Sequence, residues 1–531
     1  MTRPLSYAAF FVAFLLAPGA GPTDGLPATP PTGISTHTVG QAHATVATKQ
    51  LLIVLDGLRP DYVTPRLMPT LYSIGRRGVV FEHHHAVYPT VTRVNASSMA
   101  TGAYPGTHGL LGNTVFFPKV DPRRFLETQD RSNLLKIEAS GDRLLTTIAL
   151  GEVLQAAGKR LLVVSAGSTG ASYLLNSKGS GGGIIQTSYT LPATLHPQVI
   201  AALGEADADH MSSAEKNRRA VDAFLKVGLR EIDPAVTVFW FTDPDTVAHA
   251  KGIGHPDTVV ALSRLDNEIK RLFDGLSQAG VLSTTDIWIT SDHGFSTHTG
   301  APDLDAVLRP FSGVLADGTP RIVESEGAIY VRDHEPATIV RIVDQLQHTA
   351  GIGAIFTPAS IVGSLDGRVS GTLSFGTIRW AHERAADILF SPDWTDRANG
   401  YGYRGTSASE GTAGHGSTSP FDVHNILIAI GPDVRSGDHG RNPSGNVDFA
   451  PTFLKLVGVE IPASMEGRVL EDALRMGARS IGSVRHERHT ARLADGSYAV
   501  TADFSLLEAG GRTYRYLDST SVSRKRAVAR Q

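Results

Sequence analysis

Leu51-Leu-Ile-Val-Leu55-Asp56 is the stretch that decides the fold of this 531-residue chain. Such a continuous apolar run is typical of a strand that is buried on both faces of a parallel sheet. Runs of the same kind recur at residues 160–164, 236–241, 286–290 and 425–430. Helical patterns separate them, as at residues 142–158 and 259–280. The sequence therefore predicts an α/β fold, with a mostly parallel sheet sandwiched by helices.

Polar residues follow these runs at the points where the strands should end. Asp56 follows the first run directly, Asp245 lies four residues beyond Phe241, and Asp292-His293 come two residues after Thr290. In open α/β sheets, ligands bind beyond the carboxyl ends of the strands. We therefore expect these side chains to converge on one site, although they are far apart in the chain.

The types and spacing of these residues favour a metal centre. Asp245 and His249 are four residues apart, so one helical turn would place both on the same face. Asp292 and His293 precede a glycine that permits a tight turn, and His415 lies within a glycine-rich loop. The chain contains no cysteine, so His and Asp must hold any metal, which suits zinc, with manganese or iron as substitutes.

The candidate nucleophile lies in Tyr88-Pro-Thr-Val-Thr92-Arg-Val-Asn95, which precedes a run of small residues. The pattern predicts a short helix that begins near Asn95, with the Thr92 hydroxyl at its positive end. Two alternatives stay open at this point. Thr92 or Asn95 would simply cap the helix, or Thr90 would be the nucleophile.

The order of these motifs resembles the alkaline phosphatase superfamily, and within it the nucleotide pyrophosphatase/phosphodiesterase branch. The motifs are Leu-Asp56-Gly-Leu-Arg-Pro-Asp-Tyr62, Pro89-Thr-x-Thr92-x-x-Asn95, Thr-Gly102-x-Tyr-Pro-x-x-His-Gly109, Asp245-x-x-x-His249, Ser-Asp-His-Gly294 and Gly-His415-Gly. They fall within residues 48–300 and 405–475. The resemblance implies an alkaline phosphatase-like core.

The resemblance also implies a division of the site residues between two zinc ions. One ion would be held by Asp245, His249 and His415, and the other by Asp56, Thr92, Asp292 and His293. A small-molecule phosphate ester would be cleaved through a threonyl-phosphate intermediate on Thr92. Asn113 matches the asparagine that in this branch donates a hydrogen bond to a phosphoryl oxygen.

The choice between diester and monoester depends on positive charge near the phosphoryl oxygens. Threonine-using monoesterases that the chain resembles carry a Lys-x-Arg in a stretch that corresponds to residues 165–172, which here contain neither Lys nor Arg. This favours a phosphate diester or pyrophosphate. Arg93, a candidate substrate-binding residue, would supply the charge if it faced the site. A phosphomonoesterase or phosphonate hydrolase, and a metal-binding protein without turnover, are the alternatives; a sulfatase is disfavoured by Thr at the nucleophile position.

The chain divides into segments of different character. Residues 1–20 resemble a signal peptide, whose apolar run at residues 5–16 falls short of the roughly 20 residues that span a bilayer, and residues 21–47 resemble a linker. We expect export, periplasmic or secreted, without a stable membrane anchor. Residues 48–300 and 411–475 should form the core, residues 301–410 an inserted α+β cap, and residues 476–531 a peripheral hairpin with a frayed tail.

Composition and the other histidines add little to this interpretation. Lys and Arg total 49 against 52 Asp and Glu, which indicates no surface for nucleic acid. We expect His108 to brace the loop of Asn113. The tract at residues 83–85, together with His255, His298 and Asp243, is a weaker set of candidates for metal or pocket roles. Oligomeric state stays open.

Overall fold

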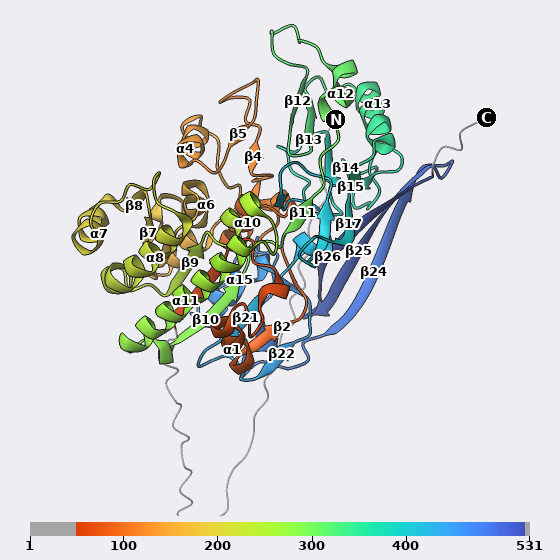
Figure 1. Ribbon diagram of the computed structural model, residues 1–531. Helices are drawn as coiled ribbons and strands as arrows, with labels where there is room; N and C mark the ends of the chain where they lie inside the picture. The colour runs from red at the N-terminus through yellow and green to blue at the C-terminus, as the bar shows by residue number, and fades with distance from the viewer. Residues whose placement is uncertain (1–48, 526–531) are drawn as a thin grey trace, which may run out of the picture. The chain divides into compact units, whose positions relative to one another are not determined.

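The computed structural model describes residues 49–525, and its centre is a nine-stranded sheet in the order β22-β2-β21-β10-β1-β9-β6-β7-β8 (Figure 1). The strands are β1 (Lys49–Leu55), β2 (Val79–Phe81), β6 (Leu161–Ser165), β7 (Gly183–Gln186), β8 (Tyr189–Leu191), β9 (Val236–Phe241), β10 (Thr285–Thr290), β21 (Leu427–Ile430) and β22 (Asp438–Gly440). The predicted signal peptide and linker, residues 1–20 and 21–47, lie outside the described residues. Within residues 49–525, no helix has the length and apolar character needed to cross a bilayer.

The predicted α/β fold is confirmed, and each of the five apolar runs forms a strand of this sheet. β1 pairs in parallel with both β10 and β9, and β9 pairs in parallel with β6. The run at residues 425–430 is an exception, because β21 is antiparallel to β10. Leu427 pairs with Thr290, so the chain enters β21 at the carboxyl end of β10 and can only run back.

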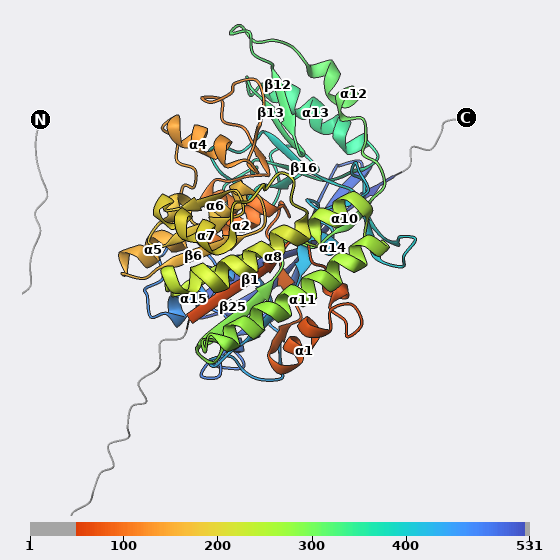
Figure 2. The ribbon, with the colours of Figure 1, turned by 60° about the vertical axis from the view of Figure 1, so that its left-hand side comes forward.

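Helices cover both faces of the sheet, and the alternation of side chains along β1 explains why. Leu52 and Val54 pack with one set of helices, α2 (Thr92–Thr101), α5 (Leu150–Ala156), α6 (Thr169–Leu175) and α15 (Phe449–Leu456). Leu51, Ile53 and Leu55 pack with the other set, α1 (Pro69–Arg77), α8 (Ser213–Ala223) and α11 (Pro256–Gln278) (Figure 2). Successive side chains of a strand point to opposite faces, so a fully apolar strand needs both layers.

The two predicted helices of this region differ in accuracy. The pattern at residues 259–280 matches α11, whereas only the second half of residues 142–158 is helical, as α5. The start of α5 is set by Glu152, whose carboxylate accepts a hydrogen bond from the backbone N–H of Ala149 at 2.8 Å. A bond of this kind satisfies a helix N-terminus and stops the helix from extending backwards.

Residues 301–410, the proposed cap, contain all five strands of a sheet in the order β12-β13-β16-β14-β15. Its elements are β12 (Ile322–Ser325), β13 (Ala328–Val331), α13 (Pro336–His348), β14 (Ile352–Thr357), β15 (Leu373–Ser374) and β16 (Ile388–Pro392). The strand patterns at residues 321–323 and 328–331 and the helical pattern at residues 337–349 correspond to β12, β13 and α13. Figure 1 shows β12, β13, α12 (Leu304–Leu308) and α13 grouped together, away from α7 (His196–Leu203) and α8.

The remaining strands and helices are short. The strands are β3 (His84–His85), β4 (Thr114–Val115), β5 (Leu126–Glu127), β11 (Ser296–His298), β17 (Trp394–Ala398), β18 (Arg404–Ser407), β19 (Ala413–Gly414), β20 (His424–Asn425) and β23 (Ser444–Gly445). The helices are α3 (Pro105–His108), α4 (Arg131–Ala139), α7 (His196–Leu203), α9 (Leu229–Glu231), α10 (Asp245–Lys251), α12 (Leu304–Leu308) and α14 (Pro420–Val423).

The C-terminal segment forms a three-stranded antiparallel sheet of β24 (Ser483–Arg492), β25 (Tyr498–Ala509) and β26 (Arg512–Arg524) rather than the predicted hairpin. The end of the predicted frayed tail, residues 526–531, lies outside the described residues. The physical reason is an alternation that the analysis of the sequence passed over. Tyr498, Val500, Ala502 and Phe504 lie on one face of β25 and are buried in the same hydrophobic cluster as Phe356 of β14. The segment therefore shares a core with the proposed cap.

Replacing Phe504 with alanine tests this shared core. Phe504 is 1% exposed, so Phe504→Ala should lower the free energy of unfolding by about 3–5 kcal/mol, as measured by urea denaturation. Val484, on the neighbouring strand β24, is 42% exposed and serves as the control. Val484→Ala should change the free energy by less than about 0.5 kcal/mol. Equal effects from the two substitutions would contradict the packing described here.

Candidate active site

Two clusters of carboxylates and histidines lie beyond the carboxyl ends of the central strands. The first cluster is Asp245, His249 and His415, and the second cluster is Asp56, Asp292 and His293. In each cluster, one potential ligand atom from every residue lies within 4.8 Å of the others. The structure thus brings together the six His and Asp residues that the sequence singled out, in the two groups that the family resemblance implies.

Local structure explains how each side chain reaches its place. Asp56 follows β1, and Asp292 and His293 follow β10. β1 and β10 are directly paired strands. Asp245 and His249 are on α10, four residues apart on one face, as predicted. His415 follows β19, which pairs with β11. The parallel central strands end at one edge of the sheet, and their terminal residues meet there.

In the second cluster, the imidazole Nε2 of His293 lies 3.1 Å from Asp292 Oδ2 and 3.7 Å from Asp56 Oδ1. The hydroxyl oxygen of Thr92 is 3.3 Å from the same Nε2 atom. In the first cluster, Asp245 Oδ1 is 3.2 Å from His249 Nε2 and 3.5 Å from His415 Nε2. The clusters adjoin, because the rings of His293 and His415 are stacked with centroids 3.5 Å apart.

The three histidines share an orientation. The Nδ1 atom of His249 is 3.0 Å from the carbonyl oxygen of Ala413, that of His415 is 2.8 Å from Thr90 O, and that of His293 is 3.0 Å from Gly294 O. An Nδ1–H that donates to a carbonyl leaves the lone pair of Nε2 free, and here each Nε2 faces a cluster. This arrangement is common among histidines that bind metals.

The carboxylates are also arranged as ligands for cations. Asp56 Oδ2 accepts a hydrogen bond from Trp240 Nε1 at 2.9 Å, and Asp292 Oδ1 accepts one from Gly57 N at 3.1 Å. The opposite oxygens, Asp56 Oδ1 and Asp292 Oδ2, and also Asp245 Oδ1, are buried without a hydrogen-bond partner among the described residues. Burial raises the pKa of the Asp56 carboxyl well above its ordinary value, and the carboxylates of Asp292 and Asp245 raise it further.

Buried negative charge that lacks partners is costly. Two divalent cations would compensate it, and a donor set of imidazole nitrogens and carboxylate oxygens suits zinc.

Thr92 is the first residue of α2, so the helix begins three residues earlier than predicted. The residue that precedes the helix is Val91, and no side chain caps it. Thr92 and Asn95 therefore do not act as caps. Asn95 instead holds the preceding loop, because its Oδ1 accepts a hydrogen bond from Val87 N at 2.7 Å. The Thr92 hydroxyl is left facing the second cluster at the positive end of α2.

Thr90, the competing nucleophile, has a structural role in this arrangement. Its hydroxyl donates to the carbonyl oxygen of Ser417 at 2.8 Å and accepts from Gly416 N at 3.1 Å. Both contacts support the loop of His415. Asn446 makes a comparable link, because its amide nitrogen donates to Asn95 Oδ1 at 2.9 Å and to the carbonyl of Asp292 at 2.8 Å. The start of α2 is thereby tied to the second cluster.

Asn113 and Arg93 line the same cavity as Thr92. Asn113 Oδ1 accepts a hydrogen bond from the backbone N–H of Arg93 at 3.0 Å, which fixes the amide plane beside the start of α2. Burial lowers the pKa of the Arg93 guanidinium from its ordinary value, whereas the carboxylates of Glu326, Asp56 and Asp245 raise it. Arg93 therefore lines the cavity of Thr92 under the influence of these carboxylates.

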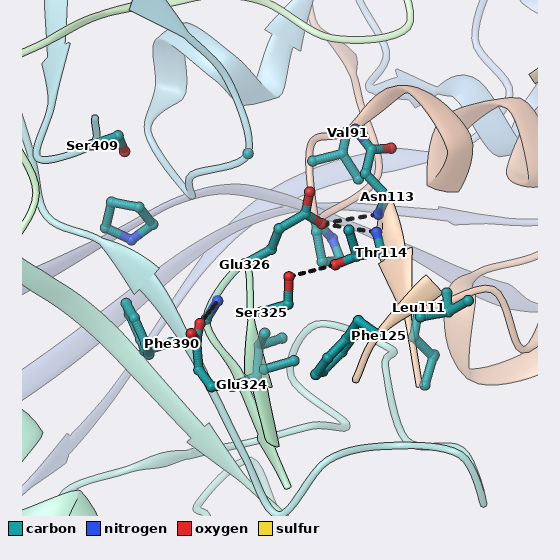
Figure 3. Close-up of a pocket in the computed structure, with 18 of the residues that line it drawn as sticks. Val91, Leu111, Asn113, Thr114, Phe125, Glu324, Ser325, Glu326, Phe390 and Ser409 are labelled. Carbon is teal, nitrogen blue, oxygen red and sulfur yellow. Dashed lines mark hydrogen bonds between the residues drawn. The ribbon is translucent and has the colours of Figure 1, made fainter. Parts of the chain in front are cut away.

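Glu326 is a residue of this site that the sequence analysis missed (Figure 3). It lies in the turn between β12 and β13 with a positive φ of 52°, and its Oε2 accepts hydrogen bonds from the backbone N–H groups of Asn113 at 3.1 Å and Thr114 at 3.2 Å. A hydrogen bond of 2.9 Å between the Thr114 and Ser325 hydroxyls adds to this contact. No motif marks Glu326; its only signal is a Glu-Gly pair between two predicted strands.

The cavity has a volume of about 1010 Å³ and joins the site to the proposed cap. Thr92, Arg93, Asn113 and the first cluster line one part of it. Apolar and aromatic side chains line another part, namely Leu111, Phe116, Phe125, Tyr330, Trp380 and Phe390. The cavity is large enough for a ligand that has both a phosphate and a ring system.

The other residues that the sequence analysis names are not members of the two clusters. His108 contacts Ser98 Oγ of α2 at 3.1 Å through Nε2 and accepts from Leu110 N at 3.1 Å through Nδ1, so it links α2 to the loop that leads to Asn113. His255 caps α11. Asp243 accepts from Asn217 Nδ2 at 2.9 Å, and burial raises its pKa to about 6.

Two further histidines that the sequence analysis names make other contacts. His298 contacts the carbonyl of Glu410. His85 belongs to a third cluster, with His424 and Asp518.

Comparison with known proteins connects this geometry to a family. Residues 50–397 match the family model described as type I phosphodiesterase / nucleotide pyrophosphatase. Among curated proteins, ectonucleotide pyrophosphatase/phosphodiesterase family member 1 of Rattus norvegicus is 25% identical over 246 residues, which cover 46% of this chain and 24% of the relative. The bis(5'-adenosyl)-triphosphatase ENPP4 of Homo sapiens is 23% identical over 267 residues, covering 50% of this chain and 51% of the relative. The chain thus spans about a quarter to a half of the length of these relatives.

Solved structures show the same fold. Human ectonucleotide pyrophosphatase/phosphodiesterase 5 aligns over 80% of this chain and 100% of its own, with a TM-score of 0.58 and 17% identity. The murine protein in an inactive form, in complex with AMP, aligns over the same shares with a TM-score of 0.57 and 16% identity. Because the matched family model covers more than half of the sequence, the chain belongs to the type I phosphodiesterase / nucleotide pyrophosphatase family.

Proposed function

We propose that the protein is an exported, zinc-dependent hydrolase of small-molecule phosphate diesters or pyrophosphates, with Thr92 as the nucleophile. The observation that carries this proposal is the position of the Thr92 hydroxyl at the start of α2, 3.3 Å from His293 Nε2 and beside both clusters. Asp245, His249 and His415 would hold one zinc ion. Asp56, Asp292, His293 and Thr92 would hold the other.

The two cations, when bound, supply positive charge that stabilises the attacking and leaving oxygens of an in-line displacement. Thr92 Oγ1 gives its proton to water and attacks phosphorus. The bond between phosphorus and the leaving oxygen breaks, the leaving oxygen takes up a proton from water, and a threonyl-phosphate forms. Water then attacks phosphorus from the side the leaving group vacated, which breaks the bond to Thr92 and restores its hydroxyl. The Asn113 amide donates a hydrogen bond to a non-bridging phosphoryl oxygen as its charge grows.

The cavity supports a leaving group with an aromatic ring. The side chains of Leu111, Phe125 and Phe390 line the cavity that also contains Asn113 (Figure 3). Such surfaces stack against planar rings and exclude water from them. The relatives carry nucleotide substrates in their names, and the murine structure was solved with AMP. We propose a nucleotide or a similar ring-bearing ester as the substrate.

Arg93 gives a specific reason to keep phosphomonoesters as a second candidate. The guanidinium lines the cavity beside Thr92, where it would favour a doubly charged monoester. Glu326 opposes this effect, because its carboxylate is the largest favourable charge acting on Arg93. Residues 165–172, which lack Lys and Arg, do not line this cavity. We favour diesters because the negative charge of Glu326 offsets the positive charge of Arg93.

Substitution of the nucleophile tests the proposal. Thr92→Ala should lower kcat on bis-p-nitrophenyl phosphate by about 1000-fold or more, because the neighbouring Thr90 hydroxyl is bonded to Ser417 O and Gly416 N and cannot replace it. Thr92→Ser should keep part of the activity. Thr101, at the other end of α2, donates its hydroxyl only to Ser97 O at 2.8 Å, so Thr101→Ala is the matched control and should stay within about threefold of the parent. Full activity in Thr92→Ala would rule out the mechanism.

The charge balance at Arg93 predicts a change in substrate preference. Glu326→Gln removes the carboxylate charge but keeps an acceptor for Asn113 N and Thr114 N. The ratio of kcat/KM for p-nitrophenyl phosphate to that for bis-p-nitrophenyl phosphate should rise on the order of tenfold, equivalent to about 1.4 kcal/mol.

Glu324→Gln is the control for this change. Glu324 also lines the cavity and accepts from Gly327 N at 3.0 Å, but it is not among the main charges acting on Arg93. The ratio of kcat/KM for the monoester to that for the diester should stay unchanged in Glu324→Gln. An unchanged ratio in Glu326→Gln would contradict the role of this carboxylate, and a strong monoester preference in the parent protein would contradict the diesterase proposal.

A further inference from the structure

A third cluster of potential metal ligands lies outside the proposed active site. It consists of His85 on β3, His424 on β20 and Asp518 on β26. One ligand atom from each residue lies within 4.8 Å of the others. None of the three lines the cavity that contains Thr92. The three residues come from distant parts of the sequence, and Asp518 belongs to the C-terminal sheet.

The pairing of β3 with β20 places the two histidines on the same face. His85 and His424 are directly opposite each other in an antiparallel register, and their ring centroids are 4.7 Å apart. His85 is 2% exposed, and Tyr516 stacks on its ring with a centroid distance of 5.4 Å. His85 is therefore held in a setting with little water, and the partly exposed ring of His424 lies against it.

Each imidazole ring forms a hydrogen bond with the backbone, as do the histidines of the proposed active site. His85 Nδ1 lies 2.9 Å from the carbonyl oxygen of Ser444, and His424 has a hydrogen bond with the backbone of His84. His85 Nε2 faces Asp518 Oδ1 at 2.8 Å. An Nδ1–H that donates to a carbonyl leaves the Nε2 lone pair facing a carboxylate, unless a second proton or a cation lies between them.

Asp518 is held in position by its neighbours on β26. Tyr516 donates its hydroxyl to Asp448 Oδ2 at 3.0 Å, and the Thr520 hydroxyl is 2.6 Å from that of Thr418. Ser505 Oγ contacts both carboxylate oxygens of Asp518 at 3.0 Å. Residues on both sides of Asp518 therefore attach β26 to the core and direct the carboxylate at the two histidines.

We propose that His85, His424 and Asp518 form a third metal site, which binds a divalent transition-metal ion and for which zinc is the best match. Two imidazole nitrogens and one carboxylate oxygen suit zinc, and water would complete a tetrahedral coordination. The ion would join the C-terminal sheet to β3, only seven residues before Thr92. Its role is structural, because it cross-links the last strand of the chain to the segment that leads into the nucleophile.

Zinc stoichiometry tests the site with the full chain. The parent protein and its variants are loaded with zinc chloride alone, dialysed against zinc-free buffer, and analysed for zinc per chain by mass spectrometry. Asp518→Asn should bind one zinc ion fewer than the parent. Asp503→Asn, which changes a partly exposed carboxylate of β25 that pairs with Arg488, should bind the same number as the parent. His424→Gln is a second, independent variant and should lose the same single ion.

Circular dichroism of each variant, which should match the parent, separates loss of the ion from loss of the fold. The proposal is overturned if Asp518→Asn and His424→Gln, both folded, hold as much zinc as Asp503→Asn. His85 and Asp518 would then be a buried ion pair only. Loss of zinc from the two clusters at Thr92 would leave this difference of one ion intact, so the two metal proposals are tested separately.

Discussion

Two buried carboxylates, those of Asp56 and Asp292, and the partly buried carboxylate of Asp245 beside them are the constraint on which the rest of the site depends. Asp56, Asp245 and Asp292 each have one oxygen without a hydrogen-bond partner in the described part of the chain, and these oxygens face the imidazole Nε2 atoms of the two clusters. Such a concentration of negative charge in a buried place is unfavourable by itself. It becomes favourable when cations compensate it. The sheet supports the arrangement, because β1, β9 and β10 are neighbours whose ends lie at one edge.

The proposed nucleophile, Thr92, is placed by the same framework. Asn446 bonds to both Asn95 and the carbonyl of Asp292, and Thr90 holds the loop that carries His415. The start of α2 therefore moves with the two clusters rather than independently of them. Catalysis by two cations needs such precision, since small errors in the position of an attacking oxygen reduce the rate strongly.

The sequence predicts the core well because its signals there are local. The apolar run at residues 51–55 and its repeats identify the strands, and a polar residue directly after a strand identifies the edge at which Asp56 and Asp292 meet. Asp245 and His249 share a helical face because they are four residues apart. Other features depend on long-range packing. The reversed direction of β21 follows from where the chain re-enters the sheet, and Glu326 reaches Asn113 only because the turn between β12 and β13 lies against that loop.

The C-terminal sheet is a different kind of error. Alternating apolar residues at positions 498, 500, 502 and 504 were visible in the sequence, but the polar residues around them indicated a peripheral segment. Their burial against the proposed cap shows that half-buried strands are easily mistaken for surface hairpins.

The central claim is that hydrolysis proceeds in two displacements through Thr92. The stereochemistry at phosphorus tests it most directly. A phosphorothioate diester of defined configuration is hydrolysed in ¹⁸O-labelled water, and the configuration of the product is determined. Each in-line displacement inverts phosphorus, so two of them through a threonyl intermediate predict net retention. Net inversion would mean that water attacks the substrate directly, and it would contradict the assignment of Thr92 as the nucleophile.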